Sequence, residues 1–186
     1  MFRKLLYSRL VTAMLHGLFS LFYSKEYLAG KFFEEKRIGY LWCLQGLFRI
    51  PLLRRTGVTW PVGRNTQILN GRNIIFDPSS INVFQQSGCY YQALEKLVIG
   101  KDVWIGPNVG IITANHNPQN PEQHLPGESV VLGDGCWIGM NSLILPGVIL
   151  GDHVTVGGGS VVTHSFPEGN CVVAGVPAKL IRRIGQ

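Results

Sequence analysis

The stretch that decides the fold is residues 132–162, LGDGCWIGMNSLILPGVILGDHVTVGGGSVV. An aliphatic residue recurs in it at every sixth position: Leu132, Ile138, Ile144, Leu150, Val156 and Val162. Three positions after each of the first five stands glycine, asparagine or histidine, residue types that tolerate left-handed backbone angles. A period of six is not helical, and the stretch is rich in glycine, which disfavours an α-helix. We therefore interpret each six-residue unit as a short strand followed by a corner.

The same period extends toward the N-terminus. Ile99, Ile105 and Ile111 form one run, and Leu69, Ile75 and Ile81 form an earlier one, with Ser87 and Ala93 keeping the count between them. The residues three after Ile99 and Ile105 are Asp102 and Asn108, which also tolerate left-handed angles. Three units make one triangular coil of 18 residues, and stacked coils bury the aliphatic column in a one-dimensional core. The sequence therefore predicts a mainly β fold, a parallel β-helix, over residues 58–186.

Two longer segments carry a family resemblance: IGKDVWIGPNVGIITANH at 99–116, and 132–184, which contains WIGMNSLILPGV and AGVPAK. They resemble the hexapeptide-repeat acyltransferases, closest to the maltose and galactoside O-acetyltransferases and the polysaccharide-biosynthesis O-acetyltransferases. The resemblance covers about residues 58–186. It implies a left-handed coil, a homotrimer, and acetyl-CoA and acceptor bound in clefts between adjacent β-helices, with no metal.

One polar segment, ITANHNPQNPEQH at 112–124, interrupts the period. Counting back from Leu132 places a unit at 126–131 and leaves a nine-residue excursion, residues 117–125. We expect Pro118 and Pro121 to prevent a strand or helix from continuing there. Loops on rigid scaffolds often carry function.

His116 is the last residue before this predicted excursion. Transfer of an acetyl group to a hydroxyl needs a base, and histidine suits that task near neutral pH. The resemblance assigns His116 as the catalytic general base. His124, within the excursion, is either an acceptor contact or a surface residue, and Asn115 beside His116 is a further candidate acceptor contact.

The resemblance places Gln86 where the maltose-type enzymes have an asparagine near the acceptor. Leu94 occupies the position of the acidic acceptor contact of the galactoside enzymes, and Gln92 is an alternative polar contact in the same region. Both glutamines also fit exposed strand positions.

The resemblance also implies a coenzyme site. Met140 and Gly158 lie 18 residues apart, at the same place in successive coils, and match positions whose backbones face the pantetheine arm. Trp137 either walls that groove or packs on the coil. Further positions match family residues that contact CoA, with a histidine replacing the usual lysine at 164: Thr163, His164, Lys179 and Arg182. The alternative for the last two is an ordinary basic C-terminal tail.

Residues 1–57 differ from the rest in charge. They hold ten Lys/Arg and three Glu, a net charge of +7, whereas residues 58–186 hold seven Lys/Arg and eight Asp/Glu, a net charge of −1. Two apolar and aromatic runs, 10–24 and 38–53, predict a helix, a loop and a second helix, so we expect a basic, amphipathic helical extension over 1–57. The uncharged run 10–24 has 15 residues, and a spanning helix needs about 20. The helices either pack on the protein or its sister subunits, or lie on an anionic membrane.

The four cysteines are scattered, without metal-binding spacing, and are interpreted as reduced, which favours a cytoplasmic protein, either free or peripheral on the inner face of the membrane. Because the basic charge is confined to 1–57, nucleic-acid binding is not expected. The predicted function is an acetyl-CoA-dependent O-acetyltransferase acting on a sugar hydroxyl in surface polysaccharide or glycolipid biosynthesis. The alternatives are N-acetylation of an amino sugar and a non-catalytic trimeric scaffold. A β-helical carbonic anhydrase would need three zinc-binding histidines at a spacing that this chain lacks.

Overall fold

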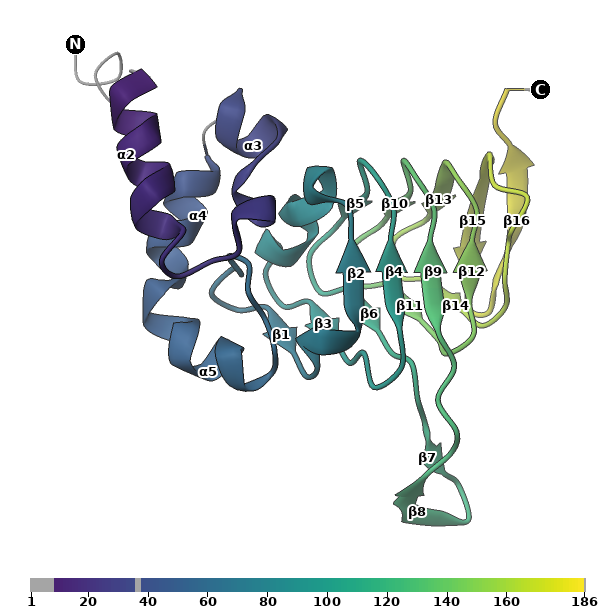
Figure 1. The fold of residues 1–186 in the computed structure, drawn as a ribbon. Coiled ribbons are helices and arrows are strands. Elements are labelled where there is room, and N and C mark those ends of the chain that lie inside the picture. The colour runs from purple at the N-terminus through teal and green to yellow at the C-terminus, as the bar shows by residue number, and fades with distance from the viewer. Residues whose placement is uncertain (1–8, 36–37, 186) are drawn as a thin grey trace.

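The computed structural model describes residues 9–35 and 38–185, and it shows short strands wound into a three-sided coil (Figure 1). The strands of the coil form three sheets, here named A, B and C. Sheet A holds β1 (Gln67–Ile68), β3 (Tyr90–Tyr91), β6 (Gly110–Ile111), β11 (Leu143–Ile144) and β14 (Val161–Val162). Sheet B holds β2 (Ile74–Phe76), β4 (Leu97–Ile99), β9 (Val130–Leu132) and β12 (Ile149–Leu150). Sheet C holds β5 (Trp104–Ile105), β10 (Trp137–Ile138), β13 (Val154–Val156), β15 (Cys171–Gly175) and β16 (Ala178–Arg183).

From β3 to β13, each full turn of the chain adds one strand to each sheet. Paired strands of the coil are parallel, as in β6, β11 and β14, where Ile111 pairs with Ile144 and Ile144 with Val162. Only the last pair of sheet C, β15 with β16, is antiparallel among the described coil strands. The chain passes from A to B to C and back to A, so the coil has three edges, here named A–B, B–C and C–A. The predicted parallel β-helix is confirmed.

The corners have the backbone conformation that the sequence predicts. Asp102 and His153 have φ angles of 52° and 57°, in the left-handed region. The other predicted corner residues also have positive φ: Asn108, Gly135, Asn141, Gly147 and Gly159.

From Ile99 onward, the predicted inward residues are buried: Ile99, Ile105, Ile111, Leu132, Ile138, Ile144, Leu150, Val156 and Val162. The expectation is wrong for the first coil, where Leu69 is 49% and Ile75 is 55% exposed. The buried residues there are Ile68, Ile74 and Phe76.

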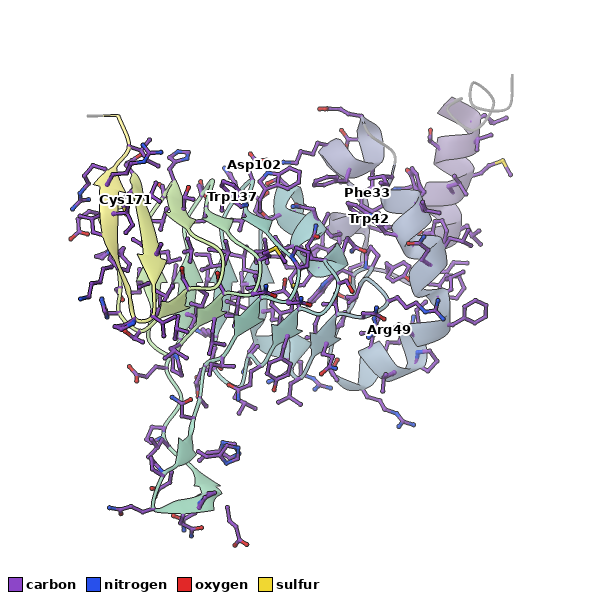
Figure 2. The ribbon with its side chains drawn as sticks, turned by 180° about the vertical axis from the view of Figure 1, so that it is seen from behind. Phe33, Trp42, Arg49, Asp102, Trp137 and Cys171 are labelled. Atoms are coloured by element: carbon purple, nitrogen blue, oxygen red, sulfur yellow. The ribbon has the colours of Figure 1, made fainter. Side chains whose placement is uncertain are left out.

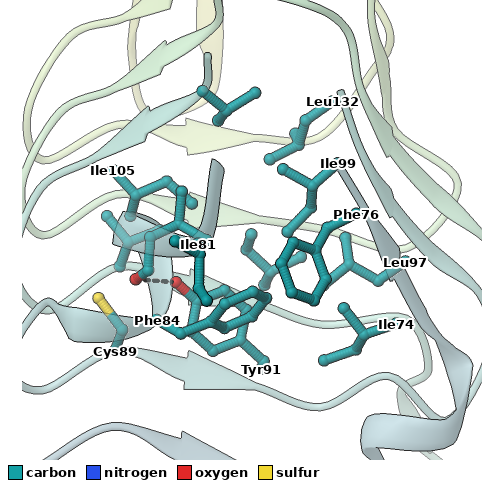
Figure 3. Close-up of a cluster of buried hydrophobic side chains, with 14 of the residues drawn as sticks. Ile74, Phe76, Ile81, Phe84, Cys89, Tyr91, Leu97, Ile99, Ile105 and Leu132 are labelled. Atoms are coloured by element: carbon teal, nitrogen blue, oxygen red, sulfur yellow. Dashed lines mark hydrogen bonds between the residues drawn. The ribbon is translucent and has the colours of Figure 1, made fainter. Parts of the chain in front are cut away.

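The period fails in this coil because the helix η4 (Pro78–Gln85) is inserted between sheets B and A. Phe76 pairs with Ile99, 23 positions later, and Tyr91 pairs with Ile111, 20 positions later, instead of 18. Ile81 is buried, but it lies in η4, and Tyr91 rather than Ser87 or Ala93 is the inward strand residue. Aromatic side chains fill the wider coil: Phe84 packs 5.1 Å from Tyr91 and 4.8 Å from Phe76, ring to ring (Figure 3).

Helices cover the N-terminal end of the coil (Figure 1). They are α2 (Arg9–Phe19), η1 (Lys25–Leu28), α3 (Lys31–Glu34), α4 (Gly39–Gly46), η2 (Leu47–Arg49) and α5 (Ile50–Arg55), with the short η3 (Gly71–Asn73) between β1 and β2. Tyr27 stacks on Phe76 with ring centroids 4.5 Å apart, so the core of the helices continues into the core of the coil. The division into 1–57 and 58–186 stays a prediction.

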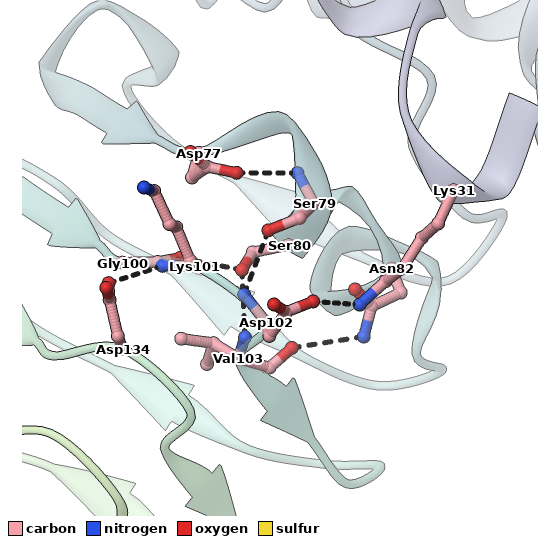
Figure 4. A network of polar contacts seen from close by, with 10 residues as sticks. All are labelled: Lys31, Asp77, Ser79, Ser80, Asn82, Gly100, Lys101, Asp102, Val103 and Asp134. Carbon is pink, nitrogen blue, oxygen red and sulfur yellow. Dashed lines mark hydrogen bonds and ion pairs between the residues drawn. The ribbon is translucent and has the colours of Figure 1, made fainter.

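A polar network ties the helices to the B–C edge (Figure 4). Lys31 of α3 pairs with Asp102, whose N–H donates to Ser79 Oγ at 2.9 Å. Lys101 N–H donates to Asp134 Oδ1 at 2.7 Å, which extends the network to the next coil. The backbone groups of this edge therefore find side-chain partners where the ladder is interrupted.

The excursion at the A–B edge is a β-hairpin of β7 (His116–Asn117) and β8 (Asn120–His124), which projects from the coil (Figure 1). It is longer than predicted. Glu128 N–H donates to Thr113 O at 2.7 Å, so the chain leaves the coil before His116. Ile111 of sheet A and Leu132 of sheet B are 21 positions apart, whereas their partners in the next coil, Ile144 and Leu150, are six apart. The excursion therefore has fifteen residues rather than nine. The expectation that Pro121 prevents a strand is also wrong: it lies in β8, in a two-stranded ribbon where an edge position tolerates proline.

Candidate active site

The base of the hairpin is held by Gln92. Its Oε1 accepts hydrogen bonds from the backbone N–H groups of Thr113 and Ala114, both at 2.9 Å. Thr113 and Ala114 are buried, so these donors have no access to water. The side chain predicted to contact acceptor thus has its oxygen engaged in fixing the point where the hairpin leaves the coil.

On the hairpin, His116 is exposed and its ring is oriented by the opposite strand. Its Nδ1 lies 2.7 Å from the carbonyl oxygen of Pro121. A carbonyl oxygen only accepts, so Nδ1 carries a proton, and in the neutral ring Nε2 bears the free lone pair. The His124 ring lies 4.2 Å from the His116 ring, tilted by 35°. The arrangement presents Nε2 as a base and restricts the motion of the ring.

Six of the predicted residues lie at the A–B edge or on its hairpin. They are Gln92, Asn115, His116, His124, Thr163 and His164. Thr163 and His164 directly follow β14, and Thr163 Oγ1 lies 2.8 Å from His164 Nδ1. Asn115 is exposed, and its carbonyl accepts from Leu125 N–H at 2.8 Å, which extends the hairpin pairing toward the coil.

Three predicted residues lie along the C–A edge. Gly159 N–H donates to Met140 O at 2.8 Å, so Met140 and Gly158 occupy the same corner in successive coils, as expected. Gln86 lies on this edge in the first coil, where it ends η4 and its carbonyl accepts from Thr66 Oγ1 at 2.6 Å. A Cβ added at Gly158 would come no closer than 3.2 Å to another atom, the carbonyl oxygen of Met140, whereas one at Gly139 would meet Gly158 N at 2.5 Å. Gly139 is therefore required for coil packing, whereas Gly158 is exposed and a side chain there would meet no atom closer than 3.2 Å.

The remaining three predicted residues lie on the outer face of sheet C. Trp137 is 58% exposed, and strand pairing places it in one row with Trp104 and Thr155. The row continues through Val172 to Arg182. Lys179 pairs with Ala174, which lies two residues after Val172 along β15, toward the C–A edge. Cationic side chains at one end and exposed aromatic ones at the other give this face a polarity along the coil.

The structure therefore divides the predicted residues into two groups, six at the A–B edge and six on the C–A edge and sheet C. One whole side of the coil, sheet A, separates the two edges. Figure 2 shows this separation: Trp137 lies in the upper part of the coil, and the hairpin projects from its lower edge. The group on the C–A edge and sheet C is here named the candidate coenzyme face. Within one chain, His116 is not adjacent to it.

The comparisons with known proteins agree with this architecture. The family model described as bacterial transferase hexapeptide (six repeats) matches residues 129–164. The crystal structure of a maltose O-acetyltransferase from Clostridium difficile 630 is 30% identical in sequence, and the alignment covers 96% of this chain and 87% of that one, with a TM-score of 0.51.

This chain belongs to the hexapeptide-repeat acyltransferases.

Other members give the same assignment. A putative lipopolysaccharide biosynthesis O-acetyl transferase, WbbJ, of Escherichia coli K12 is 37% identical over 125 residues, 61% of this chain and 62% of WbbJ. The galactoside O-acetyltransferase of that organism is 40% identical over 94 residues, 48% of this chain and 45% of the enzyme. The chain thus spans about half to three-fifths of the length of these curated relatives. The Vibrio cholerae hexapeptide-repeat acetyltransferase VCA0836, in complex with acetyl-CoA, is 22% identical, covers 97% of this chain and 92% of its own, has a TM-score of 0.61, and shows the fold alone.

In this hexapeptide-repeat chain, two contributors to the site carry no signal in the sequence. Pro121 acts through its carbonyl oxygen, which every residue possesses, and Trp104 joins the row of Trp137 only through strand register. Across residues 9–35 and 38–185, no group of three or more His, Cys, Asp and Glu side chains is arranged to hold a metal ion.

Proposed function

We propose that this protein is an O-acetyltransferase that transfers the acetyl group of acetyl-CoA to a sugar hydroxyl. The observation that carries the proposal is the hydrogen bond between His116 Nδ1 and the Pro121 carbonyl, because it leaves Nε2 available as a base on an exposed arm. The names of the similar proteins, among them maltose, galactoside and lipopolysaccharide O-acetyltransferases, support the reaction class.

In the proposed reaction, bound acetyl-CoA would supply the acetyl thioester. His116 Nε2 removes the hydroxyl proton as the hydroxyl oxygen bonds to the acetyl carbon, and it then donates this proton to the departing thiolate. Between these steps the ring is an imidazolium, and its Nδ1–H remains bonded to the Pro121 carbonyl, which stabilises the positive charge. The products are an acetyl ester and CoA, and no covalent enzyme intermediate is required.

The face of sheet C and the C–A edge fit acetyl-CoA. Lys179 and Arg182 supply cations for its phosphates. Trp137 and Met140 are exposed apolar side chains suited to the pantetheine arm, and Gly158, stacked on Met140, exposes its backbone beside them. Thr163 and His164 lie on the other edge, so they contact the same molecule only if two copies of the chain meet.

We infer that the complete site forms between neighbouring copies in a homotrimer. The hairpin of one copy would bring His116 to the C–A edge of the next, where Met140 and Gly158 occupy the same corner position and Gln86 lies in the first coil. Closed three-fold symmetry would repeat this contact three times with one kind of interface. The inferred left hand of the coil accords with the fold of the structural neighbours.

The acceptor that we propose is a sugar unit of a surface polysaccharide or glycolipid, and a cytoplasmic location belongs to the same proposal. The test is release of CoA from acetyl-CoA with a panel of sugar acceptors. His116→Ala is expected to lower kcat by about 100-fold or more, the usual contribution of a general base. A variant as fast as the wild-type enzyme would contradict the role of His116.

Product chemistry separates O- from N-acetylation. An acetyl ester is cleaved by mild alkali, whereas the amide of an acetylated amino sugar is not, and mass spectrometry of the product before and after treatment distinguishes them. An alkali-stable product would replace the hydroxyl acceptor by an amine. No CoA release with any acceptor would favour a scaffold.

A further inference from the structure

The N-terminal helices carry two stripes of exposed apolar side chains. On α2 and the turn after it, Leu10, Met14, Leu18 and Leu21 are spaced as one helical stripe, and on α4 to α5 so are Leu41, Leu44, Phe48 and Leu52. Their exposed fractions range from 49% to 97%, the highest being that of Phe48. We name these eight side chains the outer helical face.

The opposite sides of the same helices are buried. Phe19 of α2 stacks with Tyr40 of α4 at 6.3 Å between ring centroids, and Cys43, Ile50 and Leu53 are buried in the core. Each of these helices therefore has one side packed in the core and a second side, the outer helical face, that is exposed. Two stripes of exposed apolar side chains on helices that contact each other are typical of an interaction site.

The charged residues around the outer helical face indicate which kind of partner it fits. The sequence has no acidic residue from position 36 to position 76, and the helices α4 to α5 carry only Arg49, Arg54 and Arg55. Arg49 is bound to the coil by the carbonyl of Thr66 at 2.8 Å, whereas Arg54 and Arg55 are exposed at the end of α5. Arg54 also donates to the carbonyl oxygens of Leu21 and Phe22, at 3.5 and 3.4 Å, which holds its charge beside the stripe of α2. The glutamates of this part of the chain, Glu26, Glu34 and Glu35, lie on or beside η1 and α3, the helices that contact η4 of the coil.

We propose that the outer helical face docks on the surface of an anionic lipid bilayer. Apolar side chains flanked by arginines match the acyl boundary and the anionic headgroups, respectively. A second copy of this chain is a poorer partner because it would bring a second net charge of +7 in residues 1–57 against the first. No helix among residues 9–35 and 38–185 is long and apolar enough to cross a membrane, and α2, with 11 residues, is about 16 Å long. The helices would therefore lie along the surface.

Docking on a bilayer would set where the enzyme works, and it does not depend on the acetyl transfer. A protein held at a bilayer by its N-terminal end would keep its coil and hairpin in the aqueous phase, since both lie beyond the helices (Figure 1). Such a location would favour lipid-linked sugars as acceptors. In a three-fold assembly with copies side by side, three outer helical faces would point the same way and bind with avidity.

The test is co-sedimentation of the full chain with vesicles of phosphatidylcholine alone or with a third of phosphatidylglycerol, at low and high salt. We expect at least tenfold stronger binding to the anionic vesicles, weakened by salt. Phe48→Gln with Leu44→Gln is expected to reduce binding about tenfold or more, because two inserted apolar side chains are lost. Arg54→Gln with Arg55→Gln should reduce it about fivefold for each charge.

The matched control is Ile75→Thr with Ile149→Thr, which removes two exposed apolar side chains from the outer face of sheet B and should leave vesicle binding unchanged. Absence of binding to both vesicles, or equal binding to both, would overturn the proposal. So would a changed oligomeric mass of the Phe48/Leu44 variant with unchanged vesicle binding, since the face would then join copies of the chain. CoA release with a water-soluble sugar acceptor should be equal in wild type and variants, so failure of the enzymatic proposal is recognised separately.

Discussion

Replacing Gln92 tests whether the hairpin is positioned from its base. Gln92→Leu removes the oxygen that accepts from the N–H groups of Thr113 and Ala114, whose side chains are 0% and 5% exposed. An unsatisfied buried donor costs about 1–3 kcal/mol, so the two together cost about 2–6 kcal/mol. Because the hairpin projects from the coil, we expect much of this free energy to appear as local opening of the hairpin base rather than as global unfolding.

The assays are amide hydrogen exchange at Thr113 and Ala114 and steady-state kinetics. Both amides should exchange faster in Gln92→Leu, and kcat should fall by about 10- to 100-fold, because a small displacement of a catalytic base is costly. The KM for acetyl-CoA should change less than kcat, since most candidate coenzyme contacts lie on sheet C and the C–A edge and only Thr163 and His164 share the edge of Gln92.

Gln92→Glu is the discriminating control because a carboxylate still accepts from both N–H groups, while it loses the amide NH2 that could bind an acceptor. We expect this variant to retain most of the activity. If Gln92→Glu is damaged as much as Gln92→Leu, the side chain acts on the acceptor through its NH2 group and the positioning role is refuted. Unchanged exchange in Gln92→Leu would refute it as well.

Three further outcomes are expected. Gly158→Ala should keep its melting temperature within a few degrees and raise the KM for acetyl-CoA, whereas Gly139→Ala should be strongly destabilised in thermal unfolding, because its Cβ would meet backbone at 2.5 Å. Ile74→Ala should lower the free energy of unfolding in urea by about 2–5 kcal/mol, and Ile75→Ala by less than about 1 kcal/mol, since only Ile74 is buried; equal losses would contradict the register of the first coil. Burial raises the pKa of Cys43 to about 12 from an ordinary value of 9.0, so iodoacetamide should not label this thiol in the folded protein at pH 8. The contribution of the neutral thiol to the free energy of unfolding should be present below pH 9 and lost as the pH rises toward 12.

The repeat region was predictable because its signals are local and consistent. A strand of two or three residues and one left-handed corner fit within six positions, so Ile138 and Asn141 disclose their roles from sequence spacing alone. In the first coil this logic fails, because η4 is accommodated by packing among Phe76, Phe84 and Tyr91 rather than by the period. Leu69 and Ile75 kept the count but not the register.

The candidate site was predictable in its residue types and not in its assembly. His116 and His124 were recognisable as candidates, but their stacking depends on a hairpin whose extent was underestimated. The orienting group of His116 is the backbone carbonyl of Pro121, which no side-chain pattern reveals. The separation of the site into two edges likewise follows from the coil geometry, since residues 116 and 137 are close in sequence and far apart on the coil.

Subunit complementation tests most directly the central claim that the site forms between copies. His116→Ala inactivates the hairpin side and Gly158→Trp obstructs the coenzyme side, so each variant alone should be inactive. Unfolding the two together, refolding them at equal amounts and measuring CoA release should recover about a quarter of the wild-type activity, because random mixing in a three-fold ring pairs an intact hairpin with an intact groove at one interface in four. Absence of any recovery in mixed trimers, verified by mass, would place the whole site within one chain and contradict the account.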